Sequence, residues 1–224
     1  MPQTLPEQLA AFRRDFEARG DVPVAIHETM HRATAELIAS GAEARALKVG
    51  DKAPDFALRD AAGVEHALAV LLASGLLVVT FYRGVWCPYC NLDLKAMEAA
   101  RAGIESLGAR LVAISPQTAP NSRRSQRENE LGFPILSDPG NAVAASFGLR
   151  FELPDYLRNL YENSFKNDLA VVNGDPSWTL PMPARFVIGQ DGTIFYAEVS
   201  ADYTNRPDPS ELLPVLREAR SSAL

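Results

Sequence analysis

Two cysteines separated by two residues are the most reactive feature of this chain. Cys87 and Cys90 are the only cysteines among 224 residues, and such a pair can cycle between a dithiol and a disulfide within one chain. The thiolate is the reactive form of cysteine, and a position at a helix N-terminus lowers the pKa of the thiol. Pro88 suits the first turn of a helix because its missing N–H needs no partner there. We therefore expect Cys87 near the N-cap of a helix, Cys90 in its first turn, and a redox role for the pair.

Metal binding is the main competing use of two close cysteines. A four-ligand zinc site needs more ligands than this pair supplies, and the three histidines (His27, His31 and His66) lie far upstream. We therefore expect no resident metal and no other cofactor. A structural disulfide, or half of a metal site shared across a dimer, remains as the alternative.

The segments around the pair must place it at the end of a strand. Residues 76–82 form a continuous run rich in β-branched and aromatic side chains, which predicts a buried central strand. A helix is expected from about Pro88 to Leu107, ending at Gly108. Further strands alternate with helices, a short helix is expected at 66–73, and the pattern closes in a hairpin near residues 183–199. This order predicts an α/β sandwich with a mixed sheet.

The first part of the chain is predicted to be a helical extension. Apolar residues recur at helical spacing from Leu5 to Phe16, and a second helix is expected at 24–39. We therefore divide the chain into an extension at 1–46 and a main domain at 47–224. A helical insert is expected within that domain at about 151–180. The extension is interpreted as packing or dimer contact, so we expect a homodimer.

Composition limits the kinds of binding partner and the cellular compartment that we expect for this protein. The net charge is −6 and the sequence pI is about 5.2, whereas a nucleic-acid partner would normally require clustered positive charge. The N-terminal residues lack the basic start and apolar run of a signal peptide, and the longest apolar run is too short to span a bilayer. We therefore expect a cytoplasmic protein with no nucleic-acid partner and no membrane attachment.

Several motifs resemble the peroxiredoxins, the alkyl hydroperoxide reductase C / thiol-specific antioxidant (AhpC/TSA) family. They are Val49-Gly-Asp-Lys-Ala-Pro-Asp-Phe-Ala-Leu, Phe81-Tyr-Arg-Gly-Val-Trp-Cys-Pro-Tyr-Cys90 and Phe186-Val-Ile-Gly-Gln-Asp-Gly192. The resemblance covers roughly 49–199 and implies a thioredoxin-like three-layer sandwich. It places Cys90 at the family's peroxidatic cysteine. It places Cys87 where the family has threonine, Arg83 where it has proline, and Pro183 where it has a helper arginine.

The same departures resemble thioredoxin, in which Trp-Cys-x-x-Cys is the active site and a cis-proline faces the disulfide. Pro183 matches that proline, so the resemblance predicts a cis bond before it. Arg185 would share a strand face with Pro183, and either it or Arg83 is expected to bring positive charge to the thiolate. Trp86 and Tyr89 are expected to cover the site. Residues 202–206 are predicted to fold over the site or onto a dimer partner.

Three functions remain open from the sequence. The first is a peroxidase, in which Cys90 becomes a sulfenic acid, closes a disulfide with Cys87 and is recycled by a thioredoxin-like or glutathione-type reductant. The second is a thiol-disulfide oxidoreductase in which Cys87 attacks and Cys90 resolves. The third is a dimeric scaffold that the disulfide merely switches, without catalysis.

Overall fold

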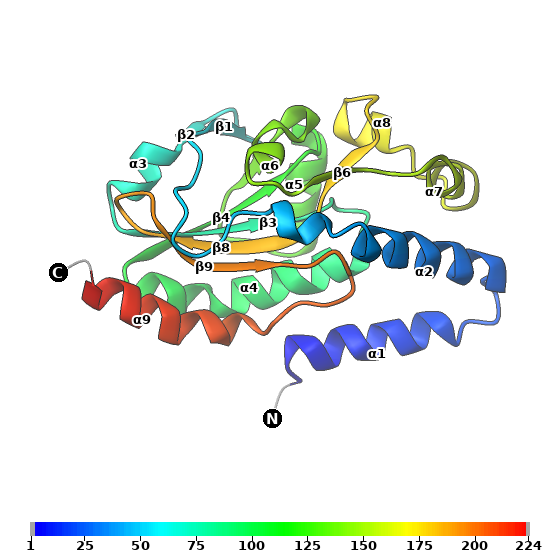
Figure 1. Ribbon diagram of the computed structural model, residues 1–224, viewed down its shortest axis with the longest axis horizontal. Coiled ribbons are helices and arrows are strands. Elements are labelled where there is room, and N and C mark those ends of the chain that lie inside the picture. Colours follow the sequence, from blue (N-terminus) through cyan, green and yellow to red (C-terminus); the bar gives the residue numbers. More distant parts are fainter. Residues whose placement is uncertain (1–2, 223–224) are drawn as a thin grey trace.

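The computed structural model describes residues 3–222, which fold as a central sheet with helices on both faces (Figure 1). The strands of this sheet are β1 (Ala57–Asp60), β2 (Glu65–Ala67), β3 (Leu76–Phe81), β4 (Ala109–Ser115), β5 (Ile135–Ser137), β8 (Ala184–Ile188) and β9 (Ile194–Val199). Their order across the sheet is β2-β1-β5-β4-β3-β8-β9. Strands β3, β4 and β5 run parallel, and the remaining pairs are antiparallel. The mixed sheet is therefore confirmed.

Strand β3 forms the middle of the core because every one of its residues is buried. Its side chains alternate between the two faces of the sheet, so both faces need a cover. Val78 packs in the cluster beneath α4 (Pro88–Ser106) and α9 (Leu212–Ser222). Leu77 and Val79 pack in the opposite cluster, which includes α3 (Leu68–Leu72) and α6 (Ala142–Ser146). This arrangement is the three-layer sandwich.

Helix α4 carries the cysteine pair and lies across one face of the sheet. It buries Leu94, Met97 and Ile104, which recur along one stripe of the helix. Helix α5 (Ala119–Glu128) lies beside it, and Asn129 donates to Asn91 across the two segments at 3.1 Å. Helix α4 starts at the end of β3, as the sequence predicts.

The N-terminal segment forms two helices, α1 (Leu5–Glu17) and α2 (Val24–Ala39), in agreement with the predicted spacing. Helix α1 begins with a capping box between Thr4 and Glu7, in which each side chain accepts a hydrogen bond from the other residue's backbone. It buries Leu5 and Leu9 in the cluster around α4. Helix α2 has no fully buried residue, so it covers the molecule loosely (Figure 1).

The insert at 151–180 mixes several short elements. It continues from β6 (Arg150–Glu152) through α7 (Asp155–Asn159), a π-helical turn at Leu160–Ser164 and α8 (Leu169–Asn173) to β7 (Thr179–Pro181). Strands β6 and β7 pair with each other outside the main sheet. The 3-10 turns η1 (Ala42–Arg45), η2 (Pro139–Asn141) and η4 (Pro209–Glu211) complete the set of elements.

The segment 66–73 departs in part from its prediction as a short helix. Residues 65–67 form β2, which pairs with β1 through Leu58 and His66, and only the following Leu68–Leu72 is helical. The short edge pairing is a tertiary contact that the local apolar pattern does not reveal. In residues 3–222, no helix combines the length and apolar character that crossing a bilayer requires.

Candidate active site

The cysteine pair lies at the start of α4, as the sequence predicts. Cys87 is the N-cap residue with extended backbone angles (φ −93°, ψ 110°), and Pro88 follows at the first helical position. The Cys87 carbonyl accepts a hydrogen bond from Asn91 N–H at 3.1 Å. Both thiols are free in this structure. Cys87 therefore lies among the unpaired N–H groups of the helix end, where negative charge is favoured.

The loop before the pair is held by side-chain hydrogen bonds. Gln117 Oε1 accepts from Val85 N–H at 2.9 Å, and Asn91 Nδ2 donates to the Val85 carbonyl at 2.8 Å. Gly84 has φ +149°, and a Cβ at this position would come within 2.5 Å of the Trp86 indole nitrogen. Only glycine therefore lets the chain turn while the indole lies against it. Gln117 belongs to the strand-end segment after β4, so the sheet itself fixes this loop.

The two sulfurs differ in their surroundings. Cys87 is 1% exposed and lies on the wall of a cavity, whereas Cys90 is 0% exposed and lies beneath it. Burial opposes ionisation of Cys87, but a hydrogen bond from Cys90 and the positive charge of Arg83 outweigh it and lower the pKa of Cys87 to about 6. Burial raises the pKa of Cys90 well above its ordinary value, and its hydrogen bond to Cys87 adds to this effect. The negative charge of the pair therefore resides on Cys87 near neutral pH.

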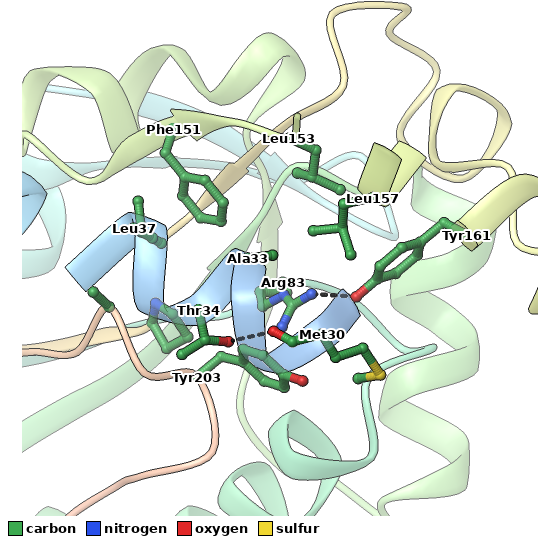
Figure 2. A pocket seen from close by; sticks show the side chains of 12 residues that line it. Met30, Ala33, Thr34, Leu37, Arg83, Phe151, Leu153, Leu157, Tyr161 and Tyr203 are labelled. Atoms are coloured by element: carbon green, nitrogen blue, oxygen red, sulfur yellow. Dashed lines mark hydrogen bonds between the residues drawn. The ribbon is translucent and has the colours of Figure 1, made fainter. Parts of the chain in front are cut away.

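Arg83 supplies a buried positive charge beside the pair. Its guanidinium donates to the Tyr161 hydroxyl at 2.5 Å and lies 4.1 Å above the ring centre of Tyr203 and 4.9 Å from that of Trp86. Figure 2 shows this guanidinium pointing at Tyr161, with Tyr203 below it and Met30 of α2 nearby. Aromatic faces attract cations and hold the charge in place without neutralising it. Arg83 is thus one of the two arginines that favour the Cys87 thiolate.

Arg206 is the second such arginine, and the sequence analysis missed it. It is buried in the segment after β9, and its positive charge helps to lower the pKa of Cys87 and partly opposes the rise in the pKa of Cys90. Its nearest carboxylate is that of Asp93, 3.7 Å from Nε. The sequence predicts 202–206 only as a covering loop, because an arginine more than a hundred residues from the cysteines carries no local signal. Tyr203 from the same loop does cover the site, packing edge-on against Tyr89 at 5.5 Å between ring centres.

Arg185 lies on the sheet beneath α4 but pairs with a different group. Its guanidinium donates to the Asp93 carboxylate at 2.5 Å, and both side chains are buried. Asp93 follows Cys90 by one turn of α4, so Arg185 reaches the helix but meets a carboxylate there. The positive charge felt by Cys87 comes from Arg83 and Arg206.

The cis bond expected before Pro183 is absent, so that prediction is wrong. No peptide bond in residues 3–222 is cis. Met182 N–H continues the pairing of β7 by bonding to the Leu149 carbonyl at 2.9 Å, and the chain enters β8 directly after Pro183. A trans bond suits this extended passage. Pro183 lines a small cavity that it shares with Arg83, and it does not line the one at Cys87.

The cavity at Cys87 has a volume of about 440 Å³. Trp86 and Tyr89 both line it, as expected, and Tyr89 also touches Phe12 of α1 at 5.0 Å between ring centres. The helices of the N-terminal segment therefore form part of its wall. No group of three or more histidine, cysteine or acidic residues lies close enough to bind a metal within residues 3–222.

Comparison with known proteins identifies the family. The model of the AhpC/TSA family matches residues 49–197, which is more than half of the chain. The chain belongs to the AhpC/TSA family. The matched part of this AhpC/TSA protein contains the cysteine pair and the strands that hold it. Helices α1 and α2 lie outside the match.

Individual relatives agree with this assignment. The AhpC/TSA protein is 29% identical over 122 residues to a Mycobacterium tuberculosis protein named as a peroxiredoxin, covering 54% of this chain and 79% of the relative. It is 29% identical over 108 residues to the thiol-disulfide oxidoreductase ResA of Geobacillus thermodenitrificans, covering 48% of this chain and 61% of the relative. The crystal structure of peroxidoxin BcpB from Mycobacterium tuberculosis superposes with a TM-score of 0.60 at 24% identity, over 77% of this chain and 97% of that one. This last likeness shows the shared fold.

Proposed function

We propose that the protein is a thiol-dependent peroxidase whose redox centre is the Cys87–Cys90 pair. Membership of the AhpC/TSA family and similarity to proteins named as peroxiredoxins support this activity. The observation that carries the proposal is the pair itself. One sulfur with a lowered pKa faces a cavity, and a second lies directly beneath it.

We further propose that Cys87 is oxidised first, which reverses the order inferred from the resemblance. Position in the family motif favours Cys90 as the attacking sulfur. The surroundings favour Cys87, because it lines the cavity and carries the lowered pKa, whereas burial disfavours the Cys90 thiolate. A buried thiol beneath the attacking sulfur is suited to resolving the intermediate instead.

The two thiols together supply the two electrons that reduce one molecule of peroxide. The Cys87 thiolate attacks the terminal peroxide oxygen, so that an S–O bond forms as the O–O bond breaks. The displaced oxygen takes up from solvent the proton that Cys87 released on ionising, and it leaves as alcohol or water. Cys90 then attacks the Cys87 sulfenic acid. An S–S bond forms, the S–O bond breaks, and the Cys90 proton leaves with the hydroxyl as water. Two electrons have passed from the sulfurs to the peroxide.

A thiol reductant must then return two electrons to the disulfide. We propose a thioredoxin-like or glutathione-type donor, which would attack Cys87 because that sulfur lies on the cavity wall. The cytoplasmic location and the homodimer stay predictions.

Mass spectrometry after one equivalent of hydrogen peroxide tests the order of oxidation. Wild-type protein should gain a Cys87–Cys90 disulfide. Cys90→Ser should stop at a sulfenic acid on Cys87 that dimedone traps, and Cys87→Ser should stay largely reduced. Oxidation of Cys90 in the Cys87→Ser variant at the wild-type rate would restore the order that the family motif suggests. The absence of peroxide consumption by the wild type would reject the peroxidase.

A thiol-disulfide oxidoreductase is the second candidate, supported by the similarity to ResA and by the Trp-Cys-Pro-Tyr-Cys sequence. Membership of the AhpC/TSA family and the similarity to proteins named as peroxiredoxins favour the peroxidase over this candidate. Insulin reduction measured beside peroxide turnover separates the two functions. Rapid insulin reduction without peroxide turnover would favour this candidate.

A further inference from the structure

The cavity at Cys87 has an aromatic wall that would not be required to bind a substrate as small as hydrogen peroxide. Aromatic side chains from several elements meet there and touch one another edge to face. Tyr161 packs against Trp86 at 5.2 Å and against Phe165 at 5.6 Å between ring centres. From α1, Phe12 and Phe16 complete the apolar lining. A volume of about 440 Å³ lies within the range of small-molecule sites. The space is therefore large enough for an organic body next to the thiolate.

The charged residues on this cavity all have the same sign. Arginine and lysine line it, and no carboxylate does so among the described residues; the cations are Arg19, Arg83, Arg124 and Lys166. The chain as a whole carries a net charge of −6. The positive charge of this cavity is therefore opposite in sign to the net charge of the protein. A cavity lined by one sign of charge concentrates ligands of the opposite sign.

The cations differ in their freedom to meet a ligand. Arg19 pairs with Asp21 at 2.6 Å, and Arg124 pairs with Glu128 at 2.7 Å, both outside the cavity wall. Lys166 is exposed, and none of the ion pairs among the described residues involves it. It follows the π-helical turn of the insert and lies beside Phe165, so a positive charge stands next to the apolar lining. That arrangement suits a ligand with an apolar body and an anionic end.

We propose that this cavity selects organic hydroperoxides that carry an apolar body and a carboxylate. The inference rests on the proposed peroxidase. The apolar body would lie among the rings of α1 and the insert, the carboxylate would meet Lys166, and the hydroperoxide would reach Cys87. Phe12, Phe16 and Arg19 come from a segment outside the AhpC/TSA match at 49–197. The N-terminal part of this lining therefore comes from a segment that the family match does not include.

A matched pair of substrates tests the charge. Cumene hydroperoxide and its para-carboxylated analogue share an apolar body and differ by one negative charge. With dithiothreitol as reductant, wild-type kcat/KM should be roughly five-fold higher for the carboxylated compound in low salt. The preference should shrink in 0.5 M KCl, because salt screens exposed charges. Equal kcat/KM values for the two compounds would overturn the proposal.

Two variants locate the selectivity. Lys166→Gln should lower the ratio of carboxylated to neutral kcat/KM by roughly two- to five-fold, the range for an exposed ion pair. Lys95→Gln removes the same charge from an exposed position of α4 outside the cavity and should leave the ratio at its wild-type value. An unchanged ratio in Lys166→Gln, or an equal fall in Lys95→Gln, would refute the assigned role of Lys166.

A binding measurement keeps the inference separate from the reaction. Titration calorimetry with 4-isopropylbenzoate, which has no peroxide group, should show binding to the reduced wild type and weaker binding to Phe16→Ala and Lys166→Gln. Failure to turn over any peroxide while 4-isopropylbenzoate binds would reject the peroxidase and keep the anion-selective cavity. Turnover of hydrogen peroxide without such binding would reject the cavity proposal alone.

Discussion

The two sides of the cavity at Cys87 are built in different ways. On the inner side, the end of β3 and the start of α4 hold the sulfurs with buried backbone, and the sheet-end residue Gln117 fixes the loop. On the outer side, helix α2 buries no residue fully, and α1 meets the site mainly through ring edges such as Phe12 on Tyr89. The inner side lies within the AhpC/TSA match, and the helices of the outer side do not. The chemistry is thus fixed by a rigid core, and access to it by a more weakly held cover.

The largest effect should come from removing the attacking sulfur on the inner side. Cys87→Ser is expected to lower peroxide turnover by roughly a thousand-fold or more, as loss of a nucleophile does in other enzymes. Cys90→Ser should retain one fast oxidation per molecule but lose turnover through the internal disulfide. Stopped-flow peroxide consumption measures both. A Cys87→Ser enzyme with wild-type turnover would show that the inner side uses the other sulfur.

The buried charges under α4 give the next largest effect. Asp93→Asn leaves the buried Arg185 without its carboxylate, and breaking such a pair costs about 3–5 kcal/mol of unfolding free energy. Denaturant unfolding of the reduced protein measures the loss. Adding Arg185→Met to the first substitution should recover part of it, because only Arg206 then remains without the Asp93 carboxylate. A loss below about 1 kcal/mol, the range of exposed pairs, would mean that the inner side is less rigid than the contacts imply.

Arg83 links the two sides, and its removal should raise the pKa of Cys87. Wild-type alkylation by iodoacetamide should rise with pH through a midpoint near 6, because the thiolate forms as pH increases past the lowered pKa. In Arg83→Met the midpoint should move upward toward the ordinary thiol value. The rate at pH 7 should then fall by roughly ten- to thirty-fold. An unchanged midpoint would mean that the hydrogen bond from Cys90, the helix end and Arg206 suffice to ionise Cys87.

The smallest effect should come from the cover. Phe12→Ala removes an edge-to-face contact with Tyr89 and should cost about 1 kcal/mol of unfolding free energy. It should also raise the labelling rate of Cys87 by a bulky maleimide more than by iodoacetamide, because access widens without a change in pKa. Phe165→Ala, on the insert side of the same cavity, is the matched control for the loss of one ring. Equal acceleration of both reagents would indicate a change in Cys87 itself and would break the division between core and cover.

The sequence predicts the inner side well because its signals are local. The apolar run before Arg83 and the proline after Cys87 are sufficient to place the pair at a strand end and a helix N-cap, and the structure agrees. The fold follows from the same alternation of strands and helices.

The charges around the pair are harder to predict because they depend on tertiary contacts. Arg206 lies far along the chain in a segment without periodicity, and only folding places it near the sulfurs. Arg185 is on the expected strand, but its ion pair with Asp93, one turn along α4 from Cys90, cannot be predicted from the pattern of a strand. The cis bond at Pro183 is predicted only by resemblance to a motif, whereas the continuous passage from β7 into β8 accommodates a trans bond.

One hydrogen bond joins opposite ends of the described chain. The backbone N–H of Leu5 donates to the Asp208 carboxylate at 3.0 Å, and the same carboxylate accepts from Ser210 N–H at the start of η4. The first turn of α1 therefore docks against a segment that a ribosome makes about two hundred residues later. Until that segment emerges, the anchor for α1 is missing and the newly made thiols lack their full shelter. Protection of the sulfurs during synthesis thus has to wait until the segment around Asp208 has been made.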